Sequence, residues 1–188
     1  MNKVVIFSAP SGSGKTTLVR HLLRQFPQLE FSVSATNRAP RGEEKDGQDY
    51  FFMTPEEFKA RVDKGDFVEW EEVYLGHCYG TLKSEVERIW AKGQVIAFDI
   101  DVCGGVKLKQ LYGEKALSVF VAPPSIEALK QRLQSRGTDT PEAIKRRIGK
   151  AEAELAYADQ FDVVIVNDNL EQAKADAELV IGNFLNDN

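Results

Sequence analysis

The sequence has few cysteines and no long hydrophobic run. Cys78 and Cys103 are the two cysteines among 188 residues, and neither has a second Cys or a His at metal-ligand spacing, which excludes a disulfide scaffold and a zinc-finger type of site. No apolar stretch approaches the roughly 18 residues that a membrane-spanning helix needs, and the N-terminal residues lack the pattern of a signal peptide. These absences predict a cytoplasmic protein with reduced thiols and no membrane partner.

Positive charge is also in short supply. The chain has 24 Lys and Arg against 29 Asp and Glu, which gives a net charge of −5. Proteins that bind bulk nucleic acid are usually basic, so this class of partner is disfavoured and any anion site must be a local pocket. Hydrophobic residues make up 43% and charged residues 28%, which is typical of one folded globular domain of this length.

Four short apolar runs predict strands that are buried on both faces. They lie at 4–7, 95–98, 117–121 and 163–166. Helical patterns follow the first run up to Pro27 and recur at 104–112, 125–136, 141–159 and 170–185. Strands that alternate with helices indicate an α/β fold, with a parallel sheet covered by helices on both faces.

The stretch from 29 to 82 interrupts this alternation. It contains short strand-like pieces around one helix, which has Thr54 as N-cap, Pro55 at its first position and Glu57 completing a capping box. We therefore expect a small mixed α+β insert at 34–81, and a lid around the irregular residues 136–140. The predicted boundaries are 1–33, 82–125 and 158–188 for the core, 34–81 for the insert and 126–157 for the lid region.

A phosphate-binding loop is the strongest motif. The segment Ala9-Pro10-Ser11-Gly12-Ser13-Gly14-Lys15-Thr16 lies between a strand and a helix, and it departs from the usual pattern only in having Ala9 where Gly is common. Its glycines let backbone N–H groups surround a phosphate, Lys15 can reach the β- and γ-phosphates, and the Thr16 hydroxyl can bind Mg²⁺. The residues expected to bind ATP here are Ser11, Gly12, Ser13, Gly14, Lys15, Thr16 and Thr17. The loop alone leaves a GTPase, an ATPase motor and a small-molecule kinase open.

A second anion site is indicated in the insert. Arg38 and Arg41 are three residues apart and follow the hydroxyl residues Ser34 and Thr36. Arginine meets phosphate with a planar, two-pronged set of donors. The same arginines, taken singly, also fit a solvated surface.

Two acidic residues follow the apolar strand at 95–98. Alternation along a strand would place Asp99 and Asp101 on the same side, facing the ligand crevice at the carboxyl end of the sheet. We assign Asp99 to the Mg²⁺ shell, through water. Further along, Arg132 and Arg136 are spaced i, i+4 on one helical face and Arg147 follows the lid loop. Such arginines also suit a salt-bridged surface.

The ordered motifs together resemble the guanylate kinase family over nearly the whole chain. They read SAPSGSGKTTL, SVSATNRAPRGEEKDGQDYFF, FVEWEEVYLGHCYGT, VIAFDIDVCGG and QRLQSRGTDTPEAIKRRI. The departures are small (Ala9 and Thr16 in the loop, Cys78 before Tyr79, Cys103-Gly104 after the acidic pair) and remove no matching polar residue. The resemblance implies transfer of the γ-phosphoryl group of ATP to GMP, with dGMP as an expected second acceptor, and with Mg²⁺.

The resemblance also implies a role for individual residues. The GMP phosphate is expected on Ser34, Arg38, Arg41, Tyr50 and Tyr79. The guanine edge is expected on Glu69, Thr81 and Asp101, because its N1–H and 2-amino donors need acceptors. Lys15, Arg132, Arg136 and Arg147 are expected to stabilise the transferred group, and Asn167 to lie near the adenine ring. Two alternatives stay open: a protein-binding scaffold module of the same fold, and a related kinase with another acceptor, such as AMP or a sugar phosphate.

Overall fold

The computed structural model describes residues 2–135 and 140–187. Its core is a parallel five-stranded sheet with the order β2-β7-β1-β8-β9. The strands are β1 (Val4–Ser8), β2 (Leu29–Phe31), β7 (Val95–Asp99), β8 (Ala116–Ala122) and β9 (Val163–Val166). The central strand β1 is fully buried, as its unbroken apolar run predicts. The α/β class is therefore confirmed.

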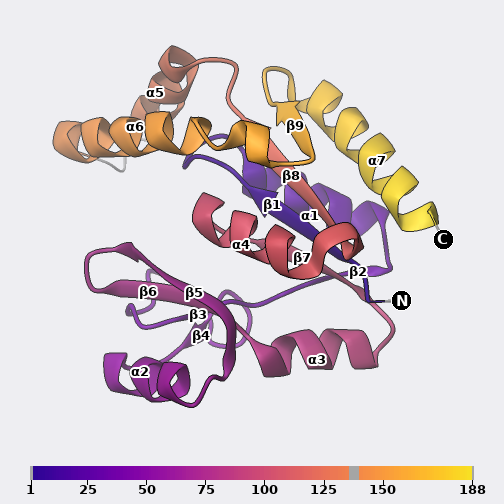
Figure 1. The fold of residues 1–188 in the computed structure, drawn as a ribbon. Helices are drawn as coiled ribbons and strands as arrows, with labels where there is room; N and C mark the ends of the chain where they lie inside the picture. The colour runs from indigo at the N-terminus through magenta and orange to yellow at the C-terminus, as the bar shows by residue number, and fades with distance from the viewer. Residues whose placement is uncertain (1, 136–139, 188) are drawn as a thin grey trace.

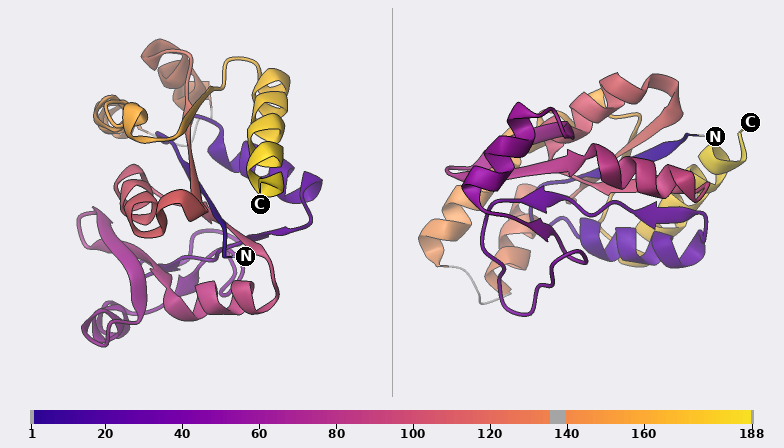
Figure 2. Two further views of the ribbon diagram at one scale, coloured as in Figure 1. Left: turned by 45° about the vertical axis from the view of Figure 1, so that its right-hand side comes forward. Right: turned by 90° about the horizontal axis from the view of Figure 1, so that it is seen from below.

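The sheet lies between two helix layers (Figure 1 and Figure 2), and alternate residues of its strands pack on one layer or the other. Val5 and Phe7 of β1 point to α1 (Lys15–Gln25) and α7 (Leu170–Asn186). Val4 and Ile6 point the other way, to α3 (Lys83–Ala91) and α4 (Val102–Tyr112). Each layer buries one face of the sheet, so the loops at its carboxyl edge are held on a fixed base.

The insert is built on a second, mixed sheet with the order β4-β3-β6-β5. Its strands are β3 (Ala35–Thr36), β4 (Phe51–Phe52), β5 (Phe67–Tyr74) and β6 (His77–Leu82). Helix α2 (Pro55–Asp63) begins with the predicted capping box, in which Thr54 Oγ1 accepts from Glu57 N at 3.1 Å and Glu57 Oε2 accepts from Thr54 N at 2.7 Å. Phe58 anchors this helix by stacking on Phe67 of β5.

The third part consists of α5 (Ile126–Ser135) and α6 (Pro141–Leu155), which pack on each other through Leu129, Leu133 and Ala151. In Figure 1 the insert lies below the core, and α5 and α6 lie above it. Short 3₁₀ turns at Gly113–Lys115 and Ala158–Gln160 precede β8 and β9. Arg136 lies outside the described residues.

Two elements differ from the sequence expectations. Helix α3 was not predicted, although its buried Val86 and Ile89 have helical spacing. Strand β7 ends at Asp99, and Asp101 is instead the N-cap of α4, where its Oδ1 accepts from Cys103 N at 2.9 Å and Gly104 N at 3.1 Å. Strand alternation therefore does not place Asp101; helix capping does. No helix of the described ranges is long and apolar enough to cross a membrane.

Candidate nucleotide-binding site

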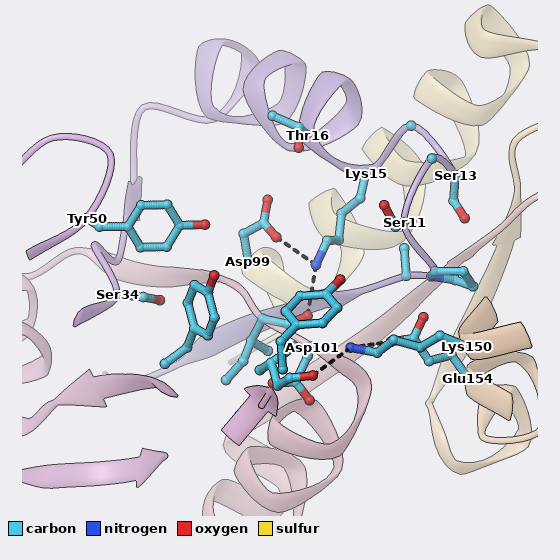
Figure 3. Close-up of a pocket in the computed structure, with 18 of the residues that line it drawn as sticks. Ser11, Ser13, Lys15, Thr16, Ser34, Tyr50, Asp99, Asp101, Lys150 and Glu154 are labelled. Atoms are coloured by element: carbon cyan, nitrogen blue, oxygen red, sulfur yellow. Dashed lines mark hydrogen bonds and ion pairs between the residues drawn. The ribbon is translucent and has the colours of Figure 1, made fainter. Parts of the chain in front are cut away.

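A cavity of about 370 Å³ connects the phosphate loop, the end of β7 and the insert. Lys15 and Thr16 line it from the loop, Asp99 and Asp101 from the core, and Tyr50 from the insert. Figure 3 shows these side chains converging from opposite sides. One cavity thus joins the residues expected to bind ATP to residues expected to bind GMP.

The loop has the geometry of an anion site. Gly12 (φ 95°) and Gly14 (φ 91°) adopt left-handed backbone conformations, which favour glycine because a Cβ is strained there. Gly14 is the N-cap of α1 and has no side chain to cap it, so the first N–H groups of the helix remain available to a phosphate. A Cβ on Gly12 would also press on Leu129 of α5, at 2.9 Å. The loop and the lid region are therefore in direct contact.

Lys15 is held at the centre of the cavity. Its Nζ forms an ion pair with Asp99 Oδ1 at 2.6 Å and donates to the Ile100 carbonyl oxygen at 2.8 Å (Figure 3). Asp99 therefore keeps the ammonium group over the cavity. The Thr16 hydroxyl and the Asp99 carboxylate line the same cavity, and a hydroxyl with a carboxylate is the kind of oxygen ligand pair that Mg²⁺ prefers. The described residues contain no cluster of three or more His, Cys, Asp or Glu that could hold a metal alone.

Arg38 is buried in the insert, and most of its donors are already used. It donates from both terminal nitrogens to Glu44, at 2.7 and 2.8 Å, and also to Tyr79 Oη at 3.1 Å and the Ala39 carbonyl oxygen at 2.9 Å. These four bonds leave one of its five N–H groups for a phosphate. The hydrogen bonds from Arg38 lower the pKa of Glu44 to about 2.

Glu44 is thus a site residue that the sequence analysis missed. Its carboxylate also accepts from Arg41 N at 2.8 Å, so it holds the backbone between the two arginines. Tyr50 lies under Arg38, with the guanidinium carbon 4.8 Å from the ring centroid, and packs edge-on against Tyr79. The sequence does show an acidic residue shortly after the two arginines. A carboxylate repels phosphate, however, so this residue type gives no reason to expect Glu44 in a phosphate-binding site.

Arg41 takes a different position from Arg38. It lines a neighbouring cavity together with Ser11 of the loop and with Arg146 and Arg147 of α6. The structure therefore separates the two arginines that the sequence placed in one set, and brings Arg41 to the cationic face of the lid helix.

The expected guanine side is a buried polar pocket. Glu69 Oε1 accepts a hydrogen bond from Thr81 Oγ1 at 2.8 Å, and both residues are buried. Burial raises the pKa of Glu69 to about 7, and the charge of Asp101 acts in the same direction. A Cβ on Gly104 would lie 3.2 Å from Glu69 Oε2, so the start of α4 closes against this carboxylate.

Arg132 and Arg147, two of the arginines expected in the lid, have different surroundings. Arg132 of α5 donates to the Asn167 carbonyl oxygen at 2.8 Å, while Arg147 of α6 lines the second cavity. Lys150 and Glu154, which the sequence analysis missed, line the main cavity from α6. Lys150 lies 4.4 Å from the ring centroid of Tyr74 in the insert. Lys150 and Glu154 follow Arg147 by three and seven residues, which places them on the same helical face. This spacing is the sequence signal from which they could have been predicted.

Comparison with known proteins identifies the family of this chain. The family model described as guanylate kinase matches residues 1–183. This chain belongs to the guanylate kinase family. A guanylate kinase of Bacteroides thetaiotaomicron is 59% identical over 98% of this chain and 90% of its own length, and one of Porphyromonas gingivalis is 50% identical over 98% and 99%. The crystal structure of guanylate kinase from Anaplasma phagocytophilum superimposes with a TM-score of 0.75 at 28% identity, over 97% of this chain and 85% of that one.

Proposed function

We propose that the protein transfers the γ-phosphoryl group of ATP to the phosphate of GMP and releases ADP and GDP, as its family membership indicates. The observation that carries the proposal is the single cavity that connects the phosphate loop with Glu69 and Tyr50 of the insert. A donor site alone would suit many nucleotide hydrolases; a donor site that opens onto an acceptor pocket suits a kinase.

The donor side would hold the triphosphate on backbone N–H groups and on Lys15. Thr16 and Asp99 are the residues we propose to hold Mg²⁺, the latter through water, and the bound ion would neutralise part of the phosphate charge. Lys15 is poised for this role because Asp99 and the Ile100 carbonyl already orient its ammonium group. We propose the cytoplasm, where ATP and GMP are available, as its site of action.

The acceptor side would hold GMP at both ends. Arg38, Ser34, Tyr50 and Tyr79 would bind its phosphate, with Arg41 reaching it from the lid side. Glu69, hydrogen-bonded to Thr81, would accept from the guanine N1–H and 2-amino groups in its ionised form, and Asp101 would support this pocket. Adenine has an acceptor at N1 and no 2-amino group, so it would leave the buried carboxylate unpaired.

No general base is required, because a phosphate dianion is itself a nucleophile. The task of the protein is to bring two anions together and exclude water, which would otherwise hydrolyse ATP. Arg147 and Lys150 on α6 face the cavities from the lid side. We therefore propose that closure of this helix brings further positive charge to the transferred group.

The test is a coupled assay of ADP formation with GMP, AMP, CMP and UMP offered separately. We expect turnover with GMP that exceeds turnover with the other three by at least about tenfold, the loss that one mismatched charge-assisted hydrogen bond produces. Equal turnover with AMP would contradict the proposed acceptor, and ADP formation that is independent of any acceptor would indicate a hydrolase.

A further inference from the structure

We infer that Asn167 is a positioning residue for the ATP phosphates, which acts by fixing the peptide unit between Ser13 and Gly14. The inference rests on the proposed phosphotransfer function, and it differs from the adenine contact expected from the sequence. It starts from one contact: Asn167 Nδ2 donates to the Ser13 carbonyl oxygen at 2.7 Å, although the two residues are 154 positions apart.

Asn167 is itself held rigidly. It follows the last residue of β9, its N–H donates to the Ala122 carbonyl oxygen at 2.8 Å, and its own carbonyl accepts from Arg132 at 2.8 Å. Only 6% of the residue is exposed. With the main chain fixed on both sides, the side chain has a defined direction, and that direction is toward the loop.

The contact determines where a phosphate-binding donor points. A peptide unit is planar and trans, so its C=O and N–H groups point in opposite directions. Because Asn167 binds the Ser13 carbonyl, the Gly14 N–H of the same peptide unit is directed away from Asn167. Gly14 is one of the residues that line the cavity. The hydrogen bond therefore keeps one donor of the loop turned toward the ligand before the ligand arrives.

The packing around Gly14 supports the same role. A Cβ at this position would overlap Asn167 Nδ2, so the amide occupies the space that a side chain on Gly14 would need. Glycine at position 14 is then required twice, by its left-handed backbone and by the close approach of Asn167. An amide placed to contact adenine would not need this fit to the loop.

The experiment compares ATP with ITP, which has the same triphosphate and a different base edge. Calorimetry with Mg²⁺ measures the affinity of both nucleotides for the wild-type protein and for Asn167→Ala. We expect both affinities to fall by the same factor, about 3- to 10-fold, which corresponds to the loss of one hydrogen bond. GMP affinity, measured alone, should stay unchanged, because GMP binds to the insert; this excludes general unfolding.

Asn169→Ala is the matched control. It removes another amide side chain two residues away, which caps α7 by accepting from Glu171 N and Gln172 N and has no contact with the loop among the bonds that the described residues show. It should lower the melting temperature and leave both nucleotide affinities within about twofold. If Asn167→Ala fails to fold, Asn167→Leu, which has a similar shape but neither the donor nor a charge, replaces it with the same expectation.

Three results would overturn the inference. If Asn167→Ala lowers the affinity for ATP alone, Asn167 is an adenine contact. If it changes neither affinity, the role of Asn167 is structural. If Asn169→Ala lowers both affinities by the same factor, the effect of Asn167→Ala is non-specific. A wild-type protein that binds neither nucleotide would instead overturn the proposed function itself, so the two failures can be distinguished.

Discussion

The donor and acceptor sides of the cavity are built in different ways. The proposed donor side is mainly one continuous segment, whose glycines and single lysine line the cavity. The proposed acceptor side is assembled from side chains on β5 and β6, on the segments before and after β3, and on the loop before β4. Its charged groups are paired in advance, Arg38 with Glu44 and Glu69 with Thr81. Backbone donors bind any phosphate, whereas placed side chains can select a base. The difference predicts that changes on the two sides affect different substrates.

The largest effect should come from the donor side. Lys15→Met removes the cation that reaches the phosphates, and we expect turnover to fall by about 100- to 1,000-fold, as when one transition-state donor is lost. GMP affinity, measured by calorimetry, should remain close to wild type because the proposed GMP site is on the insert. Near-normal turnover would remove the phosphate loop from the mechanism, and a parallel loss of GMP affinity would break the separation of the two sides.

Glu69→Gln should produce the next largest effect, and only on the acceptor side. The amide would present a donor to a guanine donor, so we expect kcat/KM for GMP to fall by about 10- to 150-fold while KM for ATP stays within about threefold. Assays at pH 8, above the raised pKa of Glu69, keep the wild-type carboxylate ionised.

Arg38→Ala serves as the control for Glu69→Gln. It should weaken GMP and AMP alike, because it removes a phosphate contact and leaves the base pocket intact. Full discrimination against AMP in Glu69→Gln would mean that Glu69 is structural and that another group recognises the base.

The pKa of Glu69 also predicts a pH dependence of GMP binding. Burial raises this pKa to about 7, so the carboxyl group is mostly protonated at pH 6 and mostly ionised at pH 8. Since guanine needs the ionised form, GMP affinity should be about tenfold weaker at pH 6 than at pH 8 from this group alone. ATP affinity, measured over the same pH range, serves as the comparison from the donor side.

The phosphate of GMP titrates near pH 6 as well, so wild type must be compared with Glu69→Gln. The variant retains the contribution of the ligand phosphate and should lose the tenfold part that belongs to Glu69. Identical pH profiles in the two proteins would exclude ionised Glu69 as the group that binds guanine.

The smallest expected effect is on stability. Thr54→Ala removes the capping box of α2, which lies in the insert and far from the loop in the fold. We expect the free energy of unfolding to fall by about 1 kcal/mol and the melting temperature by about 2–4 °C. ATP affinity should not change. A loss of ATP affinity in this variant would show that the insert and the donor side are more tightly coupled than their construction suggests.

Much of this architecture follows from local patterns. The apolar runs of β1, β7 and β8 predict buried parallel strands because no polar face is present in them. The same prediction is wrong for the burial of β9, which is parallel but lies at the edge of the sheet and leaves Val164 and Val166 exposed. The capping box of α2 and the loop before α1 are equally local, since each is specified within a few consecutive residues. Helix α3 could not be predicted in this way. It has nine residues, and an apolar periodicity this short cannot be distinguished from a loop next to a strand.

The sequence by itself determined the α/β alternation, the position of the phosphate loop and, through the ordered motifs, the family. Only the tertiary structure decided how the side chains are paired: that Glu44 accepts two hydrogen bonds from Arg38, that Asp101 caps a helix, that Arg41 lies with Arg146 and Arg147, and that Asn167 reaches the loop. The physical reason is the separation along the chain between the residues that interact. Strands, caps and tight turns are set by neighbours along the chain, whereas an ion pair or a hydrogen bond between distant segments depends on which surfaces the folded core brings together.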